Sequence, residues 1–248
     1  MAISLADMRI ELGGAMASAG TGFDAANALC DACVDLLGID GAAISMVHDG
    51  FPHGTFGASS EASRRLDEYQ FTFGEGPCLD AAASHEVVLA PDLDSPHETR
   101  WPAFAEAALE DGVRAVFALP IRITSGCVGA MDLFREGPGP LRNDQLAGGV
   151  LAAELASLPL LDLIASTQHG PGDEDDPWAQ LAELDRVEVY QATGMLISQL
   201  DVDATEALIR LRAHAIASGT TASQVALAII GRRLVLERDS RDDNGRSG

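Results

Sequence analysis

The sequence predicts an α+β domain, with a central antiparallel sheet flanked by helices, followed by an all-α domain of three helices. Three observations lead to this prediction. Apolar runs of strand length alternate with amphipathic helical segments in the N-terminal part, and two of these runs are joined by a turn too short for a parallel crossover. A polar, acidic stretch follows them. Beyond it, two helix-capping signals separate three segments of helical length.

The first domain is expected to begin with an amphipathic helix and a pair of strands. Apolar residues recur at helical spacing from Phe23 to Leu37, and Gly38 is a typical C-terminal cap. Residues 39–47 and 55–59 then form two β-rich runs around a turn rich in Gly, Pro and His. They predict a strand, a loop and a second strand.

The rest of the first domain alternates strands with helices. Three further strands are expected at residues 87–90, 115–123 and 127–134. The last two should be antiparallel neighbours, because only a short Thr-Ser-Gly turn separates them. Helices are expected at 60–69, 77–85, 101–111 and 141–166, the last one interrupted or kinked at Pro159.

The domain boundary is predicted from composition. The stretch from Gln168 to Pro177 is polar, acidic and rich in turn-forming residues, as a solvated linker is. We therefore expect a first domain at residues 1–167, a linker at 168–179, a helical domain at 180–237 and a disordered tail at 238–248.

The helical domain is delimited by its caps. The first helix is expected at residues 181–200. Asp203 with Glu206, and Thr221 with Gln224, have the spacing at which each side chain can satisfy a free N–H group at a helix start. The second helix therefore runs from Asp203 to Gly219, and the third helix is expected at 222–236.

Charge distinguishes the two domains. The chain has 38 acidic residues, 16 Arg and no Lys, for a formal charge of −22. Residues 1–180 carry −20 of this and residues 181–248 only −2. The C-terminal helices are thus the one region that a polyanion can approach without strong repulsion, which permits nucleic-acid binding without demonstrating it.

Several functional classes are excluded by what the sequence lacks. No apolar run reaches the roughly 18 residues of a membrane span, the first residues do not resemble a signal peptide, and four Cys make no disulfide framework. We therefore expect a cytoplasmic protein with no membrane partner. No phosphate loop, dinucleotide fingerprint or nucleophile–base spacing is present, and we expect no enzymatic activity.

The cysteines offer two candidates for metal or redox chemistry. Cys30 and Cys33 fall on the apolar side of a helix with no second pair, so we assign them to the core and expect no metal site and no cofactor. Cys78 follows Gly76-Pro77 at the expected start of a helix, where the helix dipole favours a thiolate. Packing explains Cys78 most simply, and sensing through its thiol is the alternative.

The C-terminal helices resemble a known RNA-binding module. The run from Arg186 to Leu196, the segment from Ala207 to Ala215 and the pair Val225-Ala226 together resemble an ANTAR domain, found in bacterial antitermination regulators. The resemblance implies binding to hairpins in mRNA leaders. Thr193 stands where many members carry Lys.

Physical arguments assign roles within this resemblance. Ala192 and Gly194 would form a flat patch for a phosphate chain, with helix packing as the alternative. Tyr190 could stack on an unpaired base, or be half-buried. The cations could contact phosphates or form a solvated surface. The candidate RNA-binding residues are Arg186, Tyr190, Ala192, Thr193, Gly194, Arg210, Arg212, His214, Arg232 and Arg233.

The first domain resembles a GAF domain, a signal-sensing fold with a central antiparallel sheet. The supporting segments are residues 74–78, 92–94, 100–104, 119–121 and 129–133. GAF-plus-ANTAR proteins of actinobacteria share this layout. The resemblance implies an unidentified small-molecule ligand, with Cys78 and Trp101 as candidate residues for ligand or redox sensing. It identifies a fold and not a ligand.

The resemblance further implies a homodimer, in which residues 141–166 form the dimerisation and relay helix. Two other functions stay open. A DNA-binding transcription factor also uses a three-helix domain, but the third helix begins Thr-Ala-Ser-Gln and offers few base-reading side chains. A protein-interaction module would use the nearly neutral helices to bind a partner.

Overall fold

The computed structural model describes residues 3–48, 51–124, 126–166 and 186–237. The chain divides into two compact units, Met1–Asp185 and Arg186–Gly248. Each is described by itself. The expected linker at 168–179 and tail at 238–248 lie outside the described residues. Within the described ranges, no single helix combines the length and apolar composition needed to cross a membrane.

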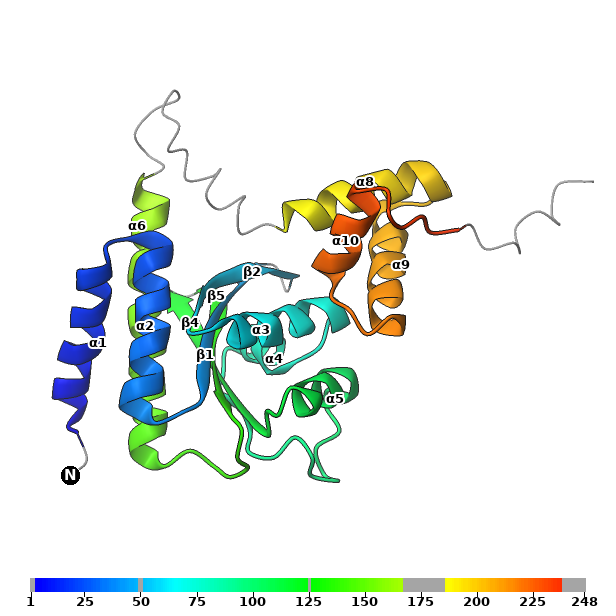
Figure 1. Ribbon diagram of the computed structural model, residues 1–248. Coiled ribbons are helices and arrows are strands. Elements are labelled where there is room, and N and C mark those ends of the chain that lie inside the picture. The colour runs from blue at the N-terminus through cyan, green and yellow to red at the C-terminus, as the bar shows by residue number, and fades with distance from the viewer. Residues whose placement is uncertain (1–2, 49–50, 125, 167–185, 238–248) are drawn as a thin grey trace, which may run out of the picture. The chain divides into compact units, whose positions relative to one another are not determined.

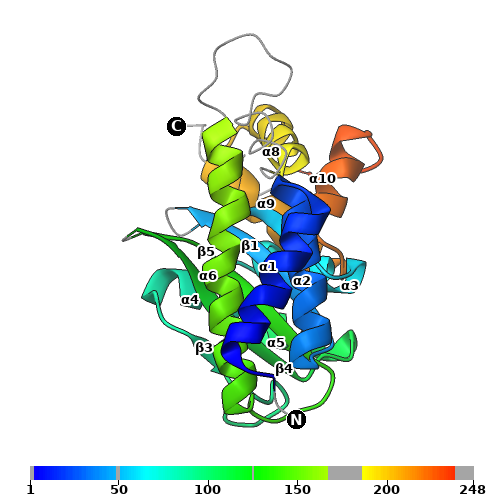
Figure 2. The ribbon, with the colours of Figure 1, turned by 90° about the vertical axis from the view of Figure 1, so that its left-hand side faces the viewer.

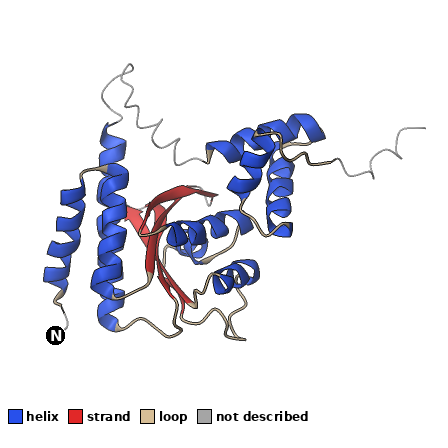
Figure 3. Cartoon of the chain, in the orientation of Figure 1, coloured by secondary structure: helices blue, strands red, loops and turns tan. Residues whose placement is uncertain are grey.

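The first unit is an α+β fold built on a five-stranded antiparallel sheet of order β2-β1-β5-β4-β3 (Figures 1 and 3). The strands are β1 (Gly41–His48), β2 (Phe51–Ala58), β3 (Val88–Ala90), β4 (Ala115–Ile123) and β5 (Gly126–Arg135). The prediction that the last two strands pair as antiparallel neighbours is confirmed. Both are buried over most of their length, which explains their continuous apolar runs.

One face of the sheet is covered by α2 (Gly22–Leu37) and α6 (Asn143–Ser166), and α1 (Leu5–Ala19) packs on the outer side of these two helices, as Figure 1 shows. In Figure 2, which looks onto this side, α1 lies in front of α2 and α6, and these two lie in front of the sheet. The other face carries α3 (Glu61–Phe73), α4 (Pro77–Ser84) and α5 (Pro102–Glu110), as Figure 1 shows. The sheet therefore lies between two helical layers, and α1 adds a further layer outside α2 and α6.

Two features of this unit differ from the prediction. Helix α1 was not expected, because Gly13 and Gly14 weaken its helical propensity and its apolar residues are not confined to one stripe. It is held instead by Met8, Leu12 and Met16, which recur every four residues and enter the core beside α2 and α6. Helix α6 runs to Ser166 as expected, but it is one continuous helix through Pro159, so the interruption that was one of the two alternatives there is absent.

The second unit consists of α8 (Val187–Leu200), α9 (Ala204–Ala217) and α10 (Ala222–Ile230). Both expected N-caps form. Asp203 accepts a hydrogen bond from the Glu206 N–H, although the Glu206 side chain pairs with Arg210 instead of capping in return, and Thr221 with Gln224 makes a complete capping box. Helix α10 is shorter than predicted. Its C-terminal cap is Gly231. The Arg233 N–H donates a hydrogen bond to the Ala228 carbonyl, and helices commonly end with such a bond from a residue beyond the cap.

Candidate functional site

A cluster of polar side chains is buried between the sheet and helices α3 and α4. Its members come from five elements of the first unit, and all but Thr55 are buried. We call this group the buried polar cluster. It consists of Ser45 on β1, Thr55 on β2, Asp67 and Gln70 on α3, Cys78 on α4 and Asp132 on β5.

Helix α3 brings two of these residues to the sheet. Ser63, Leu66, Asp67 and Gln70 follow the i, i+3, i+4, i+7 spacing of one helix face, and all four are buried. Polar side chains therefore occupy positions that an ordinary amphipathic helix fills with apolar ones. This pattern is visible in the sequence, although Asp67 and Gln70 were not among the predicted site residues. Asp132 was not predicted either, because it lies within the apolar run of β5.

Hydrogen bonds fix the orientation of the cluster. The hydroxyls of Ser45 and Thr55 donate to the two carboxylate oxygens of Asp67. The Gln70 amide lies between the other members: its Nε2 donates to Asp132 Oδ2 at 2.5 Å, and its Oε1 accepts the Cys78 N–H at 2.8 Å. Gln70 thereby links α3, the start of α4 and strand β5.

Gly76 permits this close approach. Its φ is +145°, in a region that L side chains rarely adopt, and a Cβ atom there would lie 2.6 Å from Gln70 Cγ. A larger residue would therefore push the Gln70 side chain away from the Cys78 N–H.

Burial controls the titration of the cluster. Burial, reinforced by the neighbouring Asp67, raises the pKa of Asp132 to about 8. Burial and the nearby Asp132 and Asp67 carboxyls also raise the pKa of the Cys78 thiol well above its ordinary value. The thiolate expected from the position of Cys78 at a helix start is therefore not favoured, because desolvation outweighs the helix dipole here.

Three members of the cluster carry atoms that can ligate a metal. One oxygen each of Asp67 and Asp132 and the sulfur of Cys78 all lie within 4.8 Å of one another. Asp132 Oδ1 has no hydrogen-bond partner among the described residues, although it is fully buried. Cys30 and Cys33, by contrast, lie in the apolar core against the opposite face of the sheet, as predicted.

Trp101 is packed into the core instead of lining an open site. It is buried, its indole N–H donates to Asp80 Oδ2 at 3.0 Å, and the Arg100 guanidinium lies 4.1 Å from its ring centre. The ring thus joins α4 to the segment that precedes α5. A role for Trp101 in ligand sensing would be indirect.

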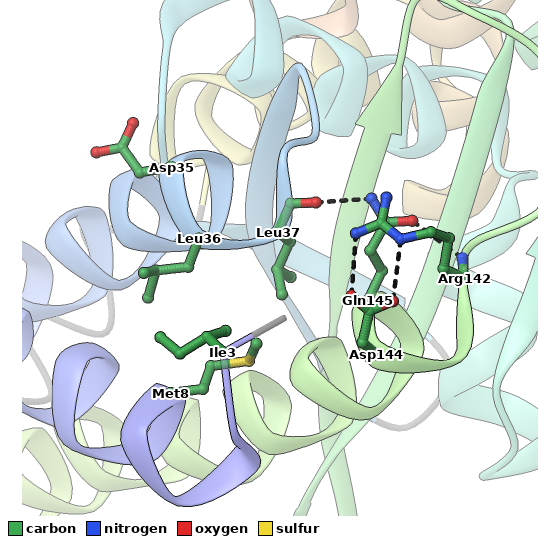
Figure 4. Close-up of a pocket in the computed structure, with 8 residues that line it drawn as sticks. All are labelled: Ile3, Met8, Asp35, Leu36, Leu37, Arg142, Asp144 and Gln145. Carbon is green, nitrogen blue, oxygen red and sulfur yellow. Dashed lines mark hydrogen bonds and ion pairs between the residues drawn. The ribbon is translucent and has the colours of Figure 1, made fainter. Parts of the chain in front are cut away.

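A pocket of about 290 Å³ opens on the helical side of the unit, between α1, α2 and the start of α6. Figure 4 shows Arg142 ion-paired with Asp144 and Gln145 donating to the Leu37 carbonyl at 2.6 Å, whereas the Asp35 carboxylate points away from them. Its arginine and amide groups are therefore occupied by structural contacts. The buried polar cluster is the stronger candidate site in this unit.

The second unit separates the predicted RNA-binding residues into buried and exposed ones. Ala192 and Thr193 are buried, and the Thr193 hydroxyl donates to the Val189 carbonyl at 2.7 Å. The predicted flat patch of Ala192 with Gly194 was therefore wrong, because two residues that are two positions apart on a helix point to nearly opposite sides of it. Gly194 alone is exposed, and a Cβ atom there would meet nothing within 4 Å.

Tyr190 lies one turn before Gly194 on the same exposed face of α8, with 54% of its surface accessible. Arg186 and Arg212 lie close to Tyr190. The pKa of Arg212 is lowered first by burial and then by the positive charge of Arg186, whereas Tyr190 raises it. These four residues, Arg186, Tyr190, Gly194 and Arg212, form a surface that we call the α8 face.

The remaining predicted contacts lie elsewhere in the unit. Arg210 is half-buried and ion-paired with Glu206, with its two closest nitrogens 2.5 and 3.0 Å from one carboxylate oxygen. His214 is half-buried near the end of α9. Arg232 and Arg233 are exposed beyond the end of α10, and Arg232 has a φ of +55°.

Comparisons with known proteins identify the first unit. Residues 24–158 match the model of the GAF domain. None of the curated proteins compared with the chain matches it. The solved structures similar to it include the GAF domain of an Acinetobacter phosphoenolpyruvate-protein phosphotransferase. That domain is 14% identical with a TM-score of 0.50, and the alignment covers 67% of this chain and 98% of the other.

A second similar structure is the GAF domain of the corresponding phosphotransferase from Coxiella burnetii. It is 15% identical with a TM-score of 0.51, and the alignment covers 65% of this chain and 95% of the other. At such identities the likeness concerns the fold alone.

Proposed function

The chain belongs to the GAF domain family, and on that premise we propose that it is a cytoplasmic, signal-responsive RNA-binding regulator. In this proposal the first unit senses a small molecule or another signal. The second unit is an ANTAR domain that binds hairpins in nascent mRNA and causes transcription antitermination. The protein acts by binding and catalyses no reaction. The resemblance of the three C-terminal helices to ANTAR domains supports the second part.

The observation that carries the RNA part is the α8 face. Gly in the interior of a helix costs about 1 kcal/mol relative to Ala, so its presence calls for a compensating role. Internal packing does not supply one, because a Cβ atom on Gly194 would meet only open space. A ligand that approaches the backbone closely would supply it, and the exposed Tyr190 ring one turn away offers a stacking surface for an unpaired base.

The electrostatics of the α8 face favour an anion. Arg186 and Arg212 are close enough for the first to lower the pKa of the second, and Arg212 is also partly desolvated. Two guanidinium groups held together in this way repel each other. An RNA phosphate between them would turn that repulsion into attraction and would accept hydrogen bonds from both.

A substitution at Gly194 tests the proposal without damaging the fold. Gly194→Leu should raise helix stability by about 1 kcal/mol, because Leu is a good helix former and the space is open. It should nevertheless weaken binding of a hairpin RNA tenfold or more, by blocking the approach to α8. Ala217→Leu, which adds the same side chain at another exposed helical position, is the matched control.

The charge contribution is measured by salt dependence. Arg212→Gln should weaken hairpin binding and reduce the slope of log K against log salt by about 1, whereas Arg210→Gln should change both less, since Glu206 already neutralises Arg210. Duplex DNA and unrelated RNA serve as competitors. Preferential binding to duplex DNA would support a DNA-binding factor instead, and absence of binding to either nucleic acid would remove the proposal.

The sensing part rests on the GAF fold and on the buried polar cluster. Native mass spectrometry of the protein purified from its host would detect a retained ligand and the oligomeric state in one measurement. A mass equal to that of the bare chain, together with no binding in a small-molecule screen, would contradict sensing by ligand binding.

A further inference from the structure

We propose that Asp67, Cys78 and Asp132 form a binding site for a single divalent cation of the first transition series, such as Fe²⁺, Co²⁺ or Zn²⁺. The three residues come from α3, α4 and β5, and one potential ligand atom from each lies within 4.8 Å of the others. This site goes beyond the proposed RNA binding and does not depend on it, since it concerns the first unit alone.

A second observation, separate from the proximity of the three groups, points to a bound ion. Asp132 Oδ1 is fully buried, and no donor among the described residues reaches it. A buried carboxylate oxygen without a partner is costly, and proteins rarely leave one so. Because the neighbouring groups are another carboxyl and a thiol, which are a metal's own ligand types, a cation can satisfy this oxygen where no hydrogen-bond donor among the described residues does.

The donor set selects the class of metal. Two carboxylates and one thiolate combine hard oxygen with soft sulfur, and a sulfur ligand disfavours Mg²⁺ and Ca²⁺. Bond lengths of about 2.0 Å to oxygen and about 2.3 Å to sulfur place the ligand atoms of a tetrahedral site roughly 3.5 Å apart. Since the three atoms already lie within 4.8 Å, small side-chain movements suffice to reach this geometry.

Each proposed ligand is oriented by a neighbouring group, as ligands in metal sites commonly are. Ser45 and Thr55 donate to Asp67, and Gln70 donates to Asp132. Gln70 also accepts the N–H of Cys78, which fixes the start of α4 against α3. Each carboxylate oxygen of Asp67 has two lone pairs, and the hydrogen bond from a hydroxyl uses only one of them. The other lone pair stays available for a bond to the metal.

The ligands change protonation when the ion binds. Binding requires Cys78 as thiolate and Asp132 as carboxylate, so the protein releases protons to the solvent as it takes up the metal. The positive ion then compensates three negative groups that burial otherwise disfavours.

The full-length protein, stripped of metal with a chelator, is titrated with Co²⁺. We expect a thiolate-to-cobalt charge-transfer band that saturates at one ion per chain, with release of protons. Cys78→Ser should abolish the band, and Asp132→Asn, which preserves the side-chain volume, should weaken cobalt binding at least tenfold. Cys127→Ser is the matched control, because Cys127 lies on β5 near Cys78 but outside the ligand set.

Two further measurements keep the outcome interpretable. The double variant Cys30→Ser, Cys33→Ser should retain the band, which excludes that pair as its source. If Cys78→Ser fails to fold, the metal site is tested by the melting temperature of the wild type. This temperature should rise when Co²⁺ or Zn²⁺ is added and should not rise when Mg²⁺ is added. Absence of a band and of any shift in the wild type, or an unchanged band in folded Cys78→Ser, would overturn the proposal. Neither result bears on RNA binding.

Discussion

Gly129 lies where β5 passes closest to β1. A Cβ atom at this position would overlap the Ser45 carbonyl oxygen and lie 3.2 Å from Met46 Cα. Both obstacles are backbone atoms held in the ladder between the two strands, so neither can rotate away. The identity of one residue thus determines how closely two central strands pair, and Ser45 in turn positions Asp67 in the buried polar cluster.

Gly129→Ala should therefore destabilise the protein by about 3 kcal/mol, at the upper end of the range for overpacked interiors. The midpoint of chemical denaturation measures this change. Gly126→Ala on the same strand is the control, since its nearest neighbour would lie 3.7 Å away in ordinary contact. Equal midpoints for the two variants would show that the strands separate more easily than the geometry implies.

Glu98 and Arg100 form a compact ion pair in the segment before α5. Hydrogen bonds from Arg100 are the largest cause that lowers the pKa of Glu98 from its ordinary 4.5. Arg100 also stacks on Trp101 and donates to the Leu89 carbonyl, so the pair anchors this segment to β3. Because the folded pKa is lowered, ionised Glu98 stabilises the fold above its unfolded pKa, and this contribution is lost as the pH falls through the lowered value.

Glu98→Gln should consequently lower the melting temperature at neutral pH, and its effect should shrink as the pH falls below the ordinary pKa of 4.5 and through the lowered pKa of the folded state. Thermal unfolding followed across this pH range measures the difference. Glu86→Gln, at an exposed position outside the pair, is the comparison variant. A difference between Glu98→Gln and wild type that stays constant with pH would argue against the ion pair as its source.

At the scale of single elements, the N-terminus of helix α5 is capped by a residue that is distant in the sequence. Its own N-cap residue, Trp101, makes no side-chain capping bond. The Glu75 carboxylate, from the connection between α3 and α4, instead accepts the N–H groups of Ala103 at 2.7 Å and Phe104 at 3.1 Å. A negative charge at this end also interacts favourably with the helix dipole.

Glu75→Ala should cost about 1 to 2 kcal/mol, the usual effect of removing an N-cap. Glu75→Gln keeps an acceptor but loses the charge, and should cost less. Glu106→Ala, an exposed position on α5 itself, controls for the loss of a carboxylate from this region. Hydrogen exchange at the Ala103 and Phe104 amides is the direct measurement, and exchange unchanged in Glu75→Ala would contradict the cap.

At the scale of the whole molecule, the outer surface of α6 has apolar residues left uncovered. Val150, Leu158 and Leu161 are 38%, 50% and 40% exposed, and Leu5 and Ile10 on the adjacent α1 are exposed as well. Clustered exposed apolar side chains on neighbouring helices are typical of association surfaces. We propose on this ground that the homodimer implied by the resemblance forms through α6, with the exposed side chains of α1 beside it.

Leu158→Glu should shift the protein from dimer to monomer, because two added carboxylates would face each other across a two-fold interface. Analytical ultracentrifugation over a range of concentrations measures the shift. Glu154 on the same helix is already exposed and paired with Arg9, so Glu154→Ala is a control for charge change alone. A wild-type protein that is monomeric at all concentrations would contradict the dimer.

The extent to which the sequence predicts the site can be judged from α3 and α8. Helical spacing alone places Asp67 and Gln70 on one face with Leu66, so two of the six members of the buried polar cluster were present in the local pattern. The capping residues of α9 and α10 were likewise fixed locally and formed as predicted. Helix α1 escaped prediction because it depends on packing more than on propensity.

By itself the sequence determined the order of the strands and of the helices other than α1, the caps of the second unit and the GAF resemblance, since each depends on residues a few positions apart. Only the tertiary structure decided that Gln70 meets Asp132, 62 residues later, or that Thr193 is buried while Gly194 is exposed. The reason is physical. Periodicity specifies which side chains share a face, whereas the pairing of distant strands and the direction in which a helix packs determine what that face meets.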